Sequence, residues 1–266
     1  MMSPAIQSRT APSLLALRGV DKTFPNGTLA LSKLDFNMRA GEFLTLLGPS
    51  GCGKSTALRI IAGLTAPSHG AVEWPDQAVT ADTASLIGFV FQEPTLMPWA
   101  SVFKNVALPL VLKGMAADKV EGRVARVLDS VGLAQFAHAF PRELSGGMRM
   151  RVSIARALVT EPRLLLMDEP FAALDEITRF KLNNDLLQLW QATETTVIFV
   201  THSVFESVYL SSSILVMTAR PGRIFAELPI DAPYPRDQNF RTSAEYAALC
   251  RRASAALAQA IAGERP

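Results

Sequence analysis

The chain has 266 residues, of which 49% are hydrophobic and 19% are charged, and its formal net charge at pH 7 is +2. This length allows one sizeable core, or a core with a smaller lobe, and the near balance of charges without a basic block gives no indication of nucleic-acid binding. Two cysteines, Cys52 and Cys250, exclude a disulfide framework.

Neither a secretion signal nor a membrane span is evident. The apolar run Ser13–Leu17 is too short for the core of a signal peptide, and no stretch approaches the roughly 18 apolar residues of a spanning helix. We therefore expect a cytosolic protein, which a partner would have to hold if it acts at a membrane.

Apolar runs bounded by turn residues predict strands, and several are apolar on consecutive residues, which is typical of a sheet covered on both faces. In chain order they are Leu15–Val20, Glu42–Gly48, Leu86–Phe91, Arg163–Glu169, Thr196–His202 and Ser213–Ala219. Helical patterns lie between them at Lys54–Gly63, Ile177–Gln191 and Val204–Leu210. The alternation predicts a doubly wound α/β domain.

Two segments depart from this alternation. The stretch from Phe103 to about Leu158 has helical patterns and no convincing strand, which predicts a helical lobe inserted into the α/β core. The alanine-rich segment Ser243–Ala262 is helical and is separated from the core by Pro229, Pro233 and Pro235. The predicted organisation is a flexible N-terminus (1–13), a main domain (14–235) with the helical lobe at about 93–160, and a C-terminal helical extension (236–266).

The stretch "GPSGCGKST" matches the phosphate-loop pattern and lies between a predicted strand and a predicted helix. Its glycines allow the backbone N–H groups to point inward at phosphate oxygens, and the helix N-terminus adds a partial positive charge. We expect Lys54 to reach the β- and γ-phosphates, Ser55 to bind Mg²⁺ and Thr56 to contact the α-phosphate side. The loop residues assigned to the nucleotide are Gly48, Pro49, Ser50, Gly51, Cys52, Gly53, Lys54, Ser55 and Thr56.

Polar side chains at other predicted strand ends complete this site, because ligands of such sheets bind at the carboxyl ends of the strands. Asp168 is placed to hold Mg²⁺, and Glu169 to polarise a water that faces the γ-phosphate; the alternative for either carboxylate alone is an acidic helix cap. His202 is expected near the same γ-phosphate, although a lone histidine at a strand end is more often structural. Gln92 has a solvated surface glutamine as its alternative.

A second candidate anion site lies in "LSGGMRMRVSIARAL", where Ser145, Gly146 and Gly147 precede a helical pattern. A plain N-cap is the alternative. With no lysine and no metal ligand, the segment would bind phosphate poorly alone. It makes sense as the lid of a site in a second copy related by a two-fold axis.

Taken together, the motifs resemble those of ABC-transporter ATPase subunits over nearly the whole chain. They stand in the family's order: "GPSGCGKST", Gln92, "LSGGM", "LLLMDEP", "ALD" ending at Asp175, and His202. The resemblance implies an α/β fold: a P-loop NTPase core with a mostly parallel sheet, an antiparallel β subdomain near the N-terminus and an inserted helical subdomain. It also implies a head-to-tail dimer that holds two ATP molecules, each facing the partner's signature serine and glycines.

The resemblance assigns further roles. It implies that Glu169 is the general base, His202 the γ-phosphate sensor, Asp175 a cross-dimer contact and Gln92 a catalytic link from Mg²⁺ to the helical lobe. Phe24 falls where the family stacks an aromatic ring on adenine, with a buried strand phenylalanine as the alternative. The sequence departs from the common signature at Met148 and Met150, which leave the serine hydroxyl and glycine amides in place.

The stretch from Phe91 to Leu110 resembles the importer ATPases of the nitrate, sulfonate, taurine and bicarbonate group. This implies ATP and Mg²⁺ as cofactors, transmembrane permease subunits as partners, an indirect link to a periplasmic or surface substrate-binding protein, and a peripheral position on the cytoplasmic face of the inner membrane. Met97, Pro98 and Trp99 form an apolar loop expected to receive a permease helix; a satellite cluster within the lobe is the alternative.

Three other functions are weighed against an importer ATPase. A soluble ABC-type ATPase usually carries two ATPase units or a long coiled-coil insertion, and this chain shows neither. A non-enzymatic nucleotide sensor conflicts with the intact set Lys54, Asp168, Glu169 and His202. A small-molecule kinase shares the phosphate loop but leaves "LSGGM" unexplained.

Overall fold

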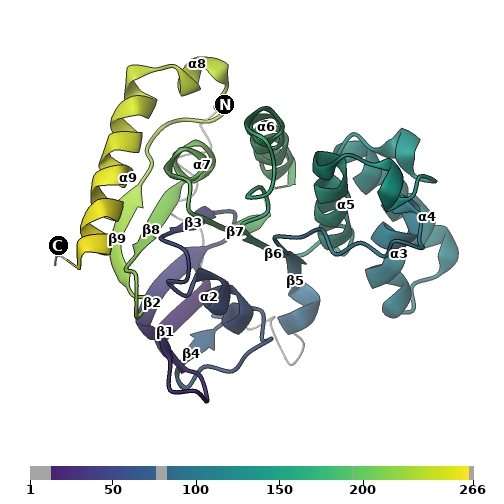
Figure 1. Cartoon of the computed structure of the whole chain (residues 1–266). Coiled ribbons are helices and arrows are strands. Elements are labelled where there is room, and N and C mark those ends of the chain that lie inside the picture. Colours follow the sequence, from purple (N-terminus) through teal and green to yellow (C-terminus); the bar gives the residue numbers. More distant parts are fainter. Residues whose placement is uncertain (1–12, 76–82, 194, 264–266) are drawn as a thin grey trace. The chain divides into compact units, whose positions relative to one another are not determined.

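A computed structural model describes residues 13–75, 83–193 and 195–263 (Figure 1). The described chain divides into two compact units: the described parts of 1–84 and 195–266 form the first, and those of 85–194 form the second. Of the N-terminus predicted to be flexible, residues 1–12 lie outside the described residues, and Ser13 begins the first strand.

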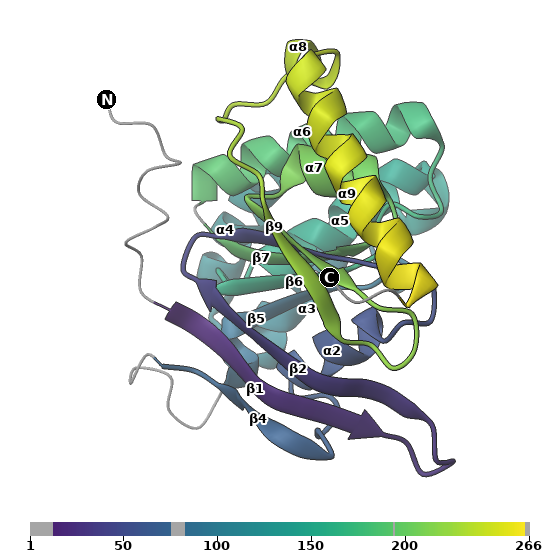
Figure 2. The ribbon, with the colours of Figure 1, turned by 90° about the vertical axis from the view of Figure 1, so that its left-hand side faces the viewer.

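An antiparallel sheet forms one part of the first unit, with the strand order β2-β1-β4 (Figure 2). Its strands are β1 (Ser13–Thr23), β2 (Leu29–Arg39) and β4 (His69–Glu73). Buried side chains alternate with exposed ones along the second half of β2, at Leu34, Phe36 and Met38, so one face of this strand packs on a core. The antiparallel β subdomain predicted near the N-terminus is thereby confirmed.

A parallel sheet supplies the centre of the same unit. Strand β3 pairs in parallel with β7 on one side and β8 on the other, and β9 pairs antiparallel with β8. The bounds are β3 (Phe43–Leu47), β7 (Thr196–Thr201), β8 (Ser213–Met217) and β9 (Ile224–Pro229). Every residue of β3, β7 and β8 is buried. Burial of each Val, Leu, Ile or Phe side chain contributes about 1.5–3 kcal/mol to the stability of the fold. These strands are therefore a stable part of the unit, and they position the loops at their ends.

Helices α2 (Lys54–Ile61), α7 (Val204–Leu210), α8 (Gln238–Arg241) and α9 (Ala244–Ala262) belong to this unit. The predicted C-terminal helix is confirmed, and it contacts α7, β8 and β9. The buried Arg236 donates to the carbonyl oxygens of Val208 (2.9 Å), Tyr209 (3.0 Å) and Ser211 (2.9 Å). Carbonyls at a helix end lack intrahelical partners, so this arginine both satisfies them and ties the C-terminal extension to α7.

The second unit holds one parallel strand pair and a group of helices. Strands β5 (Ile87–Val90) and β6 (Leu164–Asp168) pair in parallel, and α6 (Glu176–Thr193) contacts α5. Residues 91–163, all of which the structure describes, contain no strand; their α-helices are α3 (Val102–Leu112), α4 (Ala117–Ser130) and α5 (Gly146–Leu158). These helices share an apolar core that includes Val106, Val124 and Val152. The predicted helical character of this stretch is confirmed.

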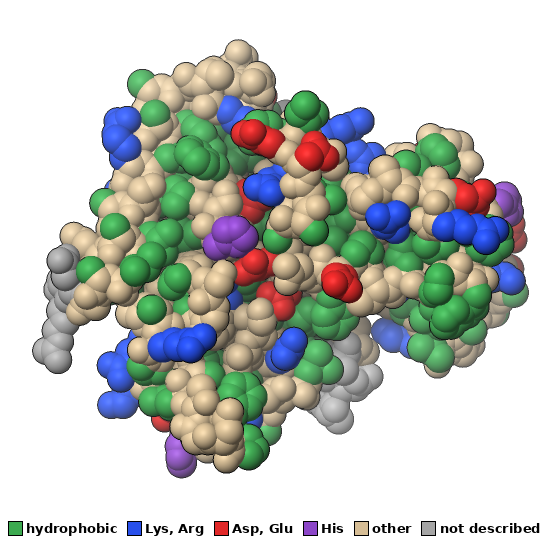
Figure 3. Space-filling model, viewed as in Figure 1, with side chains coloured by type: hydrophobic (Ala, Val, Ile, Leu, Met, Phe, Trp, Pro, Cys, Tyr) green, Lys and Arg blue, Asp and Glu red, His purple; other side chains and the backbone are tan. Residues whose placement is uncertain are grey.

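The surface gives two further findings. On the face shown in Figure 3, basic side chains are scattered among other residue types and do not gather into one patch. None of the helices in the described ranges has the length and apolar character needed to cross a lipid bilayer.

Candidate functional site

The phosphate loop joins β3 to α2, and two of its glycines have backbone angles that other residues rarely adopt. Gly51 has φ +75° and Gly53, the N-cap of α2, has φ +102°. A Cβ atom on Gly53 would lie 2.9 Å from the Ala30 carbonyl oxygen and 2.7 Å from Leu31 Cδ2. Position 53 therefore requires glycine for its conformation and for its close approach to β2.

Lys54 is the first residue of α2 and is 3% exposed. Its Nζ donates to the carbonyl oxygens of Gly48 (2.8 Å) and Pro49 (2.9 Å), at the start of the same loop. These bonds hold the ammonium group within the curl of the loop. A buried, oriented cation next to a helix N-terminus is the arrangement that binds nucleotide phosphates.

The other residues of the loop differ in exposure. Ser50 and Gly51 are exposed, while Ser55 and Thr56 are half-buried at the start of α2. The Cys52 side chain is 1% exposed, and a Cβ on Gly48 would lie 2.9 Å from its Sγ. Cys52 was expected among the nucleotide-binding residues; its thiol packs inside the protein, so only its backbone is placed to serve such a role.

His202 follows β7 directly, just as Gly48 follows β3. The two strands are parallel neighbours with Leu47 opposite Thr201, so the structure brings His202 and the phosphate loop to the same edge of one sheet. His202 is exposed. This edge is the ligand-binding edge of such sheets.

A buried carboxylate that sequence reasoning missed fixes the turn after β7. Glu206 is 7% exposed and accepts a hydrogen bond from Thr201 Oγ1 at 2.5 Å. The same Thr201 hydroxyl accepts from Ser203 N (3.0 Å), and Ser203 Oγ caps α7 by accepting from Glu206 N (3.3 Å). The residues on either side of His202, Thr201 and Ser203, are therefore both fixed by hydrogen bonds, which holds the turn that carries His202 in one shape. A buried glutamate in a short helix could have signalled a bonding partner, but not which one.

In the second unit, Asp168 is the last residue of β6 and Glu169 follows it. Asp168 is 8% exposed, and Glu169 has φ +46°, in the left-handed region that non-glycine residues rarely occupy. Strain of this kind costs about 1–3 kcal/mol and clusters at functional sites. Since Val90 of β5 pairs with Met167 of β6, the exposed Gln92 beyond β5 lies at the same strand edge as this carboxylate pair.

The signature segment begins α5. Ser145 is the N-cap, and its Oγ accepts from Met148 N at 3.3 Å. Gly147 is buried, and a Cβ there would lie 2.7 Å from Thr178 Cγ2. Within one chain these residues do what a plain helix cap does, and Gly147 also permits close packing against α6. Met150 is buried at 2% exposure and half-buried Met148 packs against the helical core, so both departures from the usual signature have packing roles.

Asp175 and Phe24 are both at the surface. Asp175 Oδ1 accepts from Thr178 N at 2.9 Å at the start of α6. Hydrogen bonds from the Thr178 side chain and amide hold the Asp175 pKa below its usual value. Phe24 is 36% exposed, with Lys22 Nζ 5.4 Å from its ring centroid. The alternative of a buried strand phenylalanine is thereby wrong, and the ring can be reached by a ligand.

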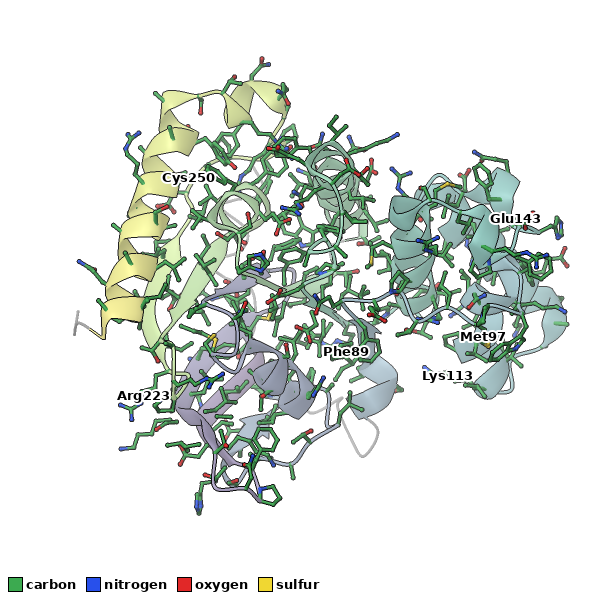
Figure 4. The ribbon with its side chains drawn as sticks, in the orientation of Figure 1. Phe89, Met97, Lys113, Glu143, Arg223 and Cys250 are labelled. Carbon is green, nitrogen blue, oxygen red and sulfur yellow. The ribbon has the colours of Figure 1, made fainter. Side chains whose placement is uncertain are left out.

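A loop of the second unit presents Trp99, which is 77% exposed. Fully buried Asn105 shapes this loop: its Oδ1 accepts from Met97 N (2.7 Å), and its Nδ2 donates to the Met97 and Ala100 carbonyl oxygens (3.2 and 3.0 Å). Figure 4 labels Met97 in this loop. Because its side chain is exposed, Trp99 is not part of a satellite core within the lobe. Sequence reasoning missed Asn105, because a single asparagine in a helix gives no sign of which loop it binds.

Comparisons with known proteins agree with this geometry. A family model described as ABC transporter matches residues 31–172. The aliphatic sulfonates import ATP-binding protein SsuB of Bacillus subtilis is 47% identical, over 84% of this chain and 84% of its own length. An uncharacterised ABC transporter ATP-binding protein of Methanocaldococcus jannaschii is 50% identical, over 83% of this chain and 81% of its own.

Solved structures are similar as well. The chain cbiO1 from Clostridium perfringens, part of the ABC transporter complex cbiONQ, superposes with a TM-score of 0.74 at 28% identity, over 82% of this chain and 89% of that one. A dimeric ATP-binding cassette in a post-hydrolysis state, bound to ADP and Pi, gives a TM-score of 0.71 at 34% identity, over 82% and 99%.

Proposed function

Because this chain belongs to the ABC transporter family as an ATP-binding subunit, we propose that it hydrolyses ATP to power an importer of aliphatic sulfonates or a related small oxyanion or organosulfur compound. One observation carries the nucleotide part: a phosphate loop with two positive-φ glycines and a buried, oriented Lys54. The similarity to the sulfonate import protein supports the cargo class.

Each site residue has a role in this proposal. Lys54 and the loop amides bind the β- and γ-phosphates, Phe24 stacks on adenine, and His202 contacts the γ-phosphate. The oxygen donors Ser55, Asp168 and Gln92 suit Mg²⁺, which prefers hard oxygen ligands and would supply charge neutralisation to the phosphates. Glu169 accepts a proton from the attacking water, a role worth about 10²–10⁴ in rate.

The proposal includes a second copy of the chain. Ser145, Gly146, Gly147 and Asp175 complete the partner's nucleotide site in a head-to-tail dimer, which explains a helix start with an exposed serine and no lysine. The dimeric cassette with ADP and Pi supports this assembly.

Membrane partners are the remaining part of the proposal. Trp99 is exposed on a loop that buried Asn105 holds in shape, and tryptophan is enriched among the residues that anchor protein interfaces. We place a permease helix against this loop, so that the chain acts at the cytoplasmic face of the inner membrane through its permease, and indirectly serves a substrate-binding protein.

The function is tested by reconstituting the chain in liposomes with its permease subunits and binding protein. ATP turnover should rise when an alkanesulfonate is added, and Glu169→Gln should remove most of it while leaving ATP binding intact. An ATP turnover that is the same with and without the cargo and the permease would favour a soluble ATPase instead. A Glu169→Gln chain with normal turnover would remove this residue from the role of base.

A further inference from the structure

The turn between β8 and β9, residues 218–223, has no role in the proposed function, yet several hydrogen bonds connect its own residues. Thr218 N donates to the Arg223 carbonyl oxygen at 3.0 Å. The Thr218 hydroxyl donates to the Pro221 oxygen (2.7 Å) and accepts from Arg223 N (3.0 Å). These bonds give the turn one internal shape.

The turn is also docked on two neighbouring segments. Gly222 N donates to the Ala30 oxygen (2.9 Å), and Ser32 N donates to the Gly222 oxygen (3.0 Å), so the turn adds a short bridge to β2. A Cβ on Gly222 would lie only 2.1 Å from the Cys52 carbonyl oxygen. The turn thus lies directly against the phosphate loop, and position 222 requires glycine for that approach.

Arg220 makes the remaining contact with the phosphate loop. Its Nε donates to the Gly51 carbonyl oxygen at 3.2 Å, and a Cβ on Gly51 would lie 2.7 Å from its Nη2. Arg220 is exposed, and no carboxylate among the described residues pairs with it. A charged guanidinium without an acidic partner among the described residues therefore lies against the exposed part of the phosphate loop.

We propose that Arg220 is a positioning residue of the nucleotide site, which fixes Gly51 in its positive-φ conformation and adds positive charge beside the phosphate-binding amides. This inference rests on the proposed ATP site. Two consequences follow from it. Arg220 raises the affinity for the anionic nucleotide, because a charge-assisted contact and a nearby cation both favour the bound loop. It leaves the chemical step nearly unchanged, because it does not belong to the groups that act on water.

Arg223 provides a matched control. It is exposed in the same turn and carries the same charge, and its hydrogen bonds within the described part of the chain are made by its backbone alone. Figure 4 shows it at the periphery of the unit. A glutamine at 220 or at 223 changes the net charge by the same amount, so only the position relative to the phosphate loop differs.

The experiment measures MgATP affinity by equilibrium titration and steady-state hydrolysis by the purified full chain, for wild type, Arg220→Gln, Arg220→Lys and Arg223→Gln. We expect Arg220→Gln to raise Kd and KM about tenfold at low salt, which corresponds to ~1.4 kcal/mol, with kcat within about twofold of wild type. Arg220→Lys, which keeps the charge but loses the planar fork, should raise Kd about threefold. Arg223→Gln should match wild type.

The results separate the two claims. If wild type and Arg223→Gln bind MgATP and Arg220→Gln binds equally well, the role of Arg220 is wrong and the ATP site stands. If wild type itself fails to bind MgATP, both are wrong. The tenfold difference should shrink at 1 M salt, where charges are screened over about 3 Å, and a salt-independent difference would overturn the electrostatic role. Should Arg220→Gln not fold, an unchanged Kd in Arg220→Lys would overturn the proposal.

Discussion

The phosphate loop (Gly48–Thr56) and the signature segment (Leu144–Leu158) both place a serine and glycines at the head of a helix, yet the two regions use glycine for different reasons. In the phosphate loop, Gly51 and Gly53 have φ of +75° and +102°. Gly147 of the signature lies inside α5, where its missing side chain lets Thr178 approach. Glycine is thus required for its backbone conformation in the phosphate loop and for close helix packing in the signature segment.

Both regions also contain a cation that is held by a carbonyl oxygen of the same segment. The phosphate loop carries Lys54, held by two carbonyls of its own loop, and so has a cation in place. In the signature segment, half-buried Arg149 donates to the Leu144 carbonyl oxygen at 2.8 Å, and the Ser145 hydroxyl caps its own helix. The signature segment differs in having no glycine with positive φ and no lysine, so it is suited to complete a site rather than to form one.

The largest effect is expected from a side chain at Gly53. Gly53→Ala combines an unfavourable φ with contacts of 2.9 Å to the Ala30 oxygen and 2.7 Å to Leu31 Cδ2. We expect a loss of roughly 3 kcal/mol in unfolding free energy and loss of MgATP binding, measured by urea unfolding and titration. The matched control is Gly63→Ala, where φ is +70° but nothing lies within 4 Å of the new Cβ. Equal losses in both variants would show that contact with β2 is irrelevant.

A smaller effect is expected at Gly147. Gly147→Ala places its Cβ 2.7 Å from Thr178 Cγ2 and should cost about 2 kcal/mol through overpacking. Thr178→Ser removes that methyl group and keeps the hydroxyl, so the double variant should recover most of the loss in urea unfolding. Gly146→Ala is the control, because a Cβ at this position would come no closer than 3.4 Å to its nearest neighbour, Leu174 Cδ2. Additive effects of Gly147→Ala and Thr178→Ser would contradict the packing role.

How much of this was predictable varies between elements. The strands β3, β6, β7 and β8 follow from uninterrupted apolar runs, and the phosphate loop from its spacing, because these depend on neighbours in sequence. Strand β2 was not identified individually: its alternation is broken near Lys33, which has φ +49° and lies beside an irregularity in the pairing with β1. The antiparallel subdomain was expected only from the family resemblance.

The partners of individual polar side chains were the part that sequence reasoning could not predict. Asn105 with the Trp99 loop, Glu206 with Thr201, and Arg220 with Gly51 each join side chains to partners chosen by the fold. A polar residue type gives no partner by itself. The dual use of Gly147 was hidden for the same reason, since Thr178 approaches it from another helix.

The smallest effect is expected at Asp175. This residue is hydrogen-bonded to Thr178, the same residue that lies against Gly147 of the signature segment. Its pKa is below the usual value because the Thr178 hydroxyl and amide donate to it. A lowered pKa in the folded state stabilises the protein above the unfolded-state pKa, about 3.9, and the contribution is lost as the pH falls through the lower folded value. The difference in unfolding midpoint between wild type and Asp175→Asn should therefore narrow slightly from pH 5 to pH 2. A constant difference over that range would mean that the cap does not depend on the charge.

In the proposed dimer, the signature segment completes the nucleotide site of a second copy. Lys54→Ala cannot hold phosphate, and Ser145→Arg has a blocked signature, so each homodimer lacks an intact site. In a head-to-tail heterodimer, one site pairs the intact Lys54 of one chain with the intact Ser145 of the other. ATP-driven association of the mixture is measured by fluorescence transfer between labelled chains. We expect mixing to restore an ATP-driven association that neither variant shows alone. No association in the mixture, with wild type associating normally, would contradict it.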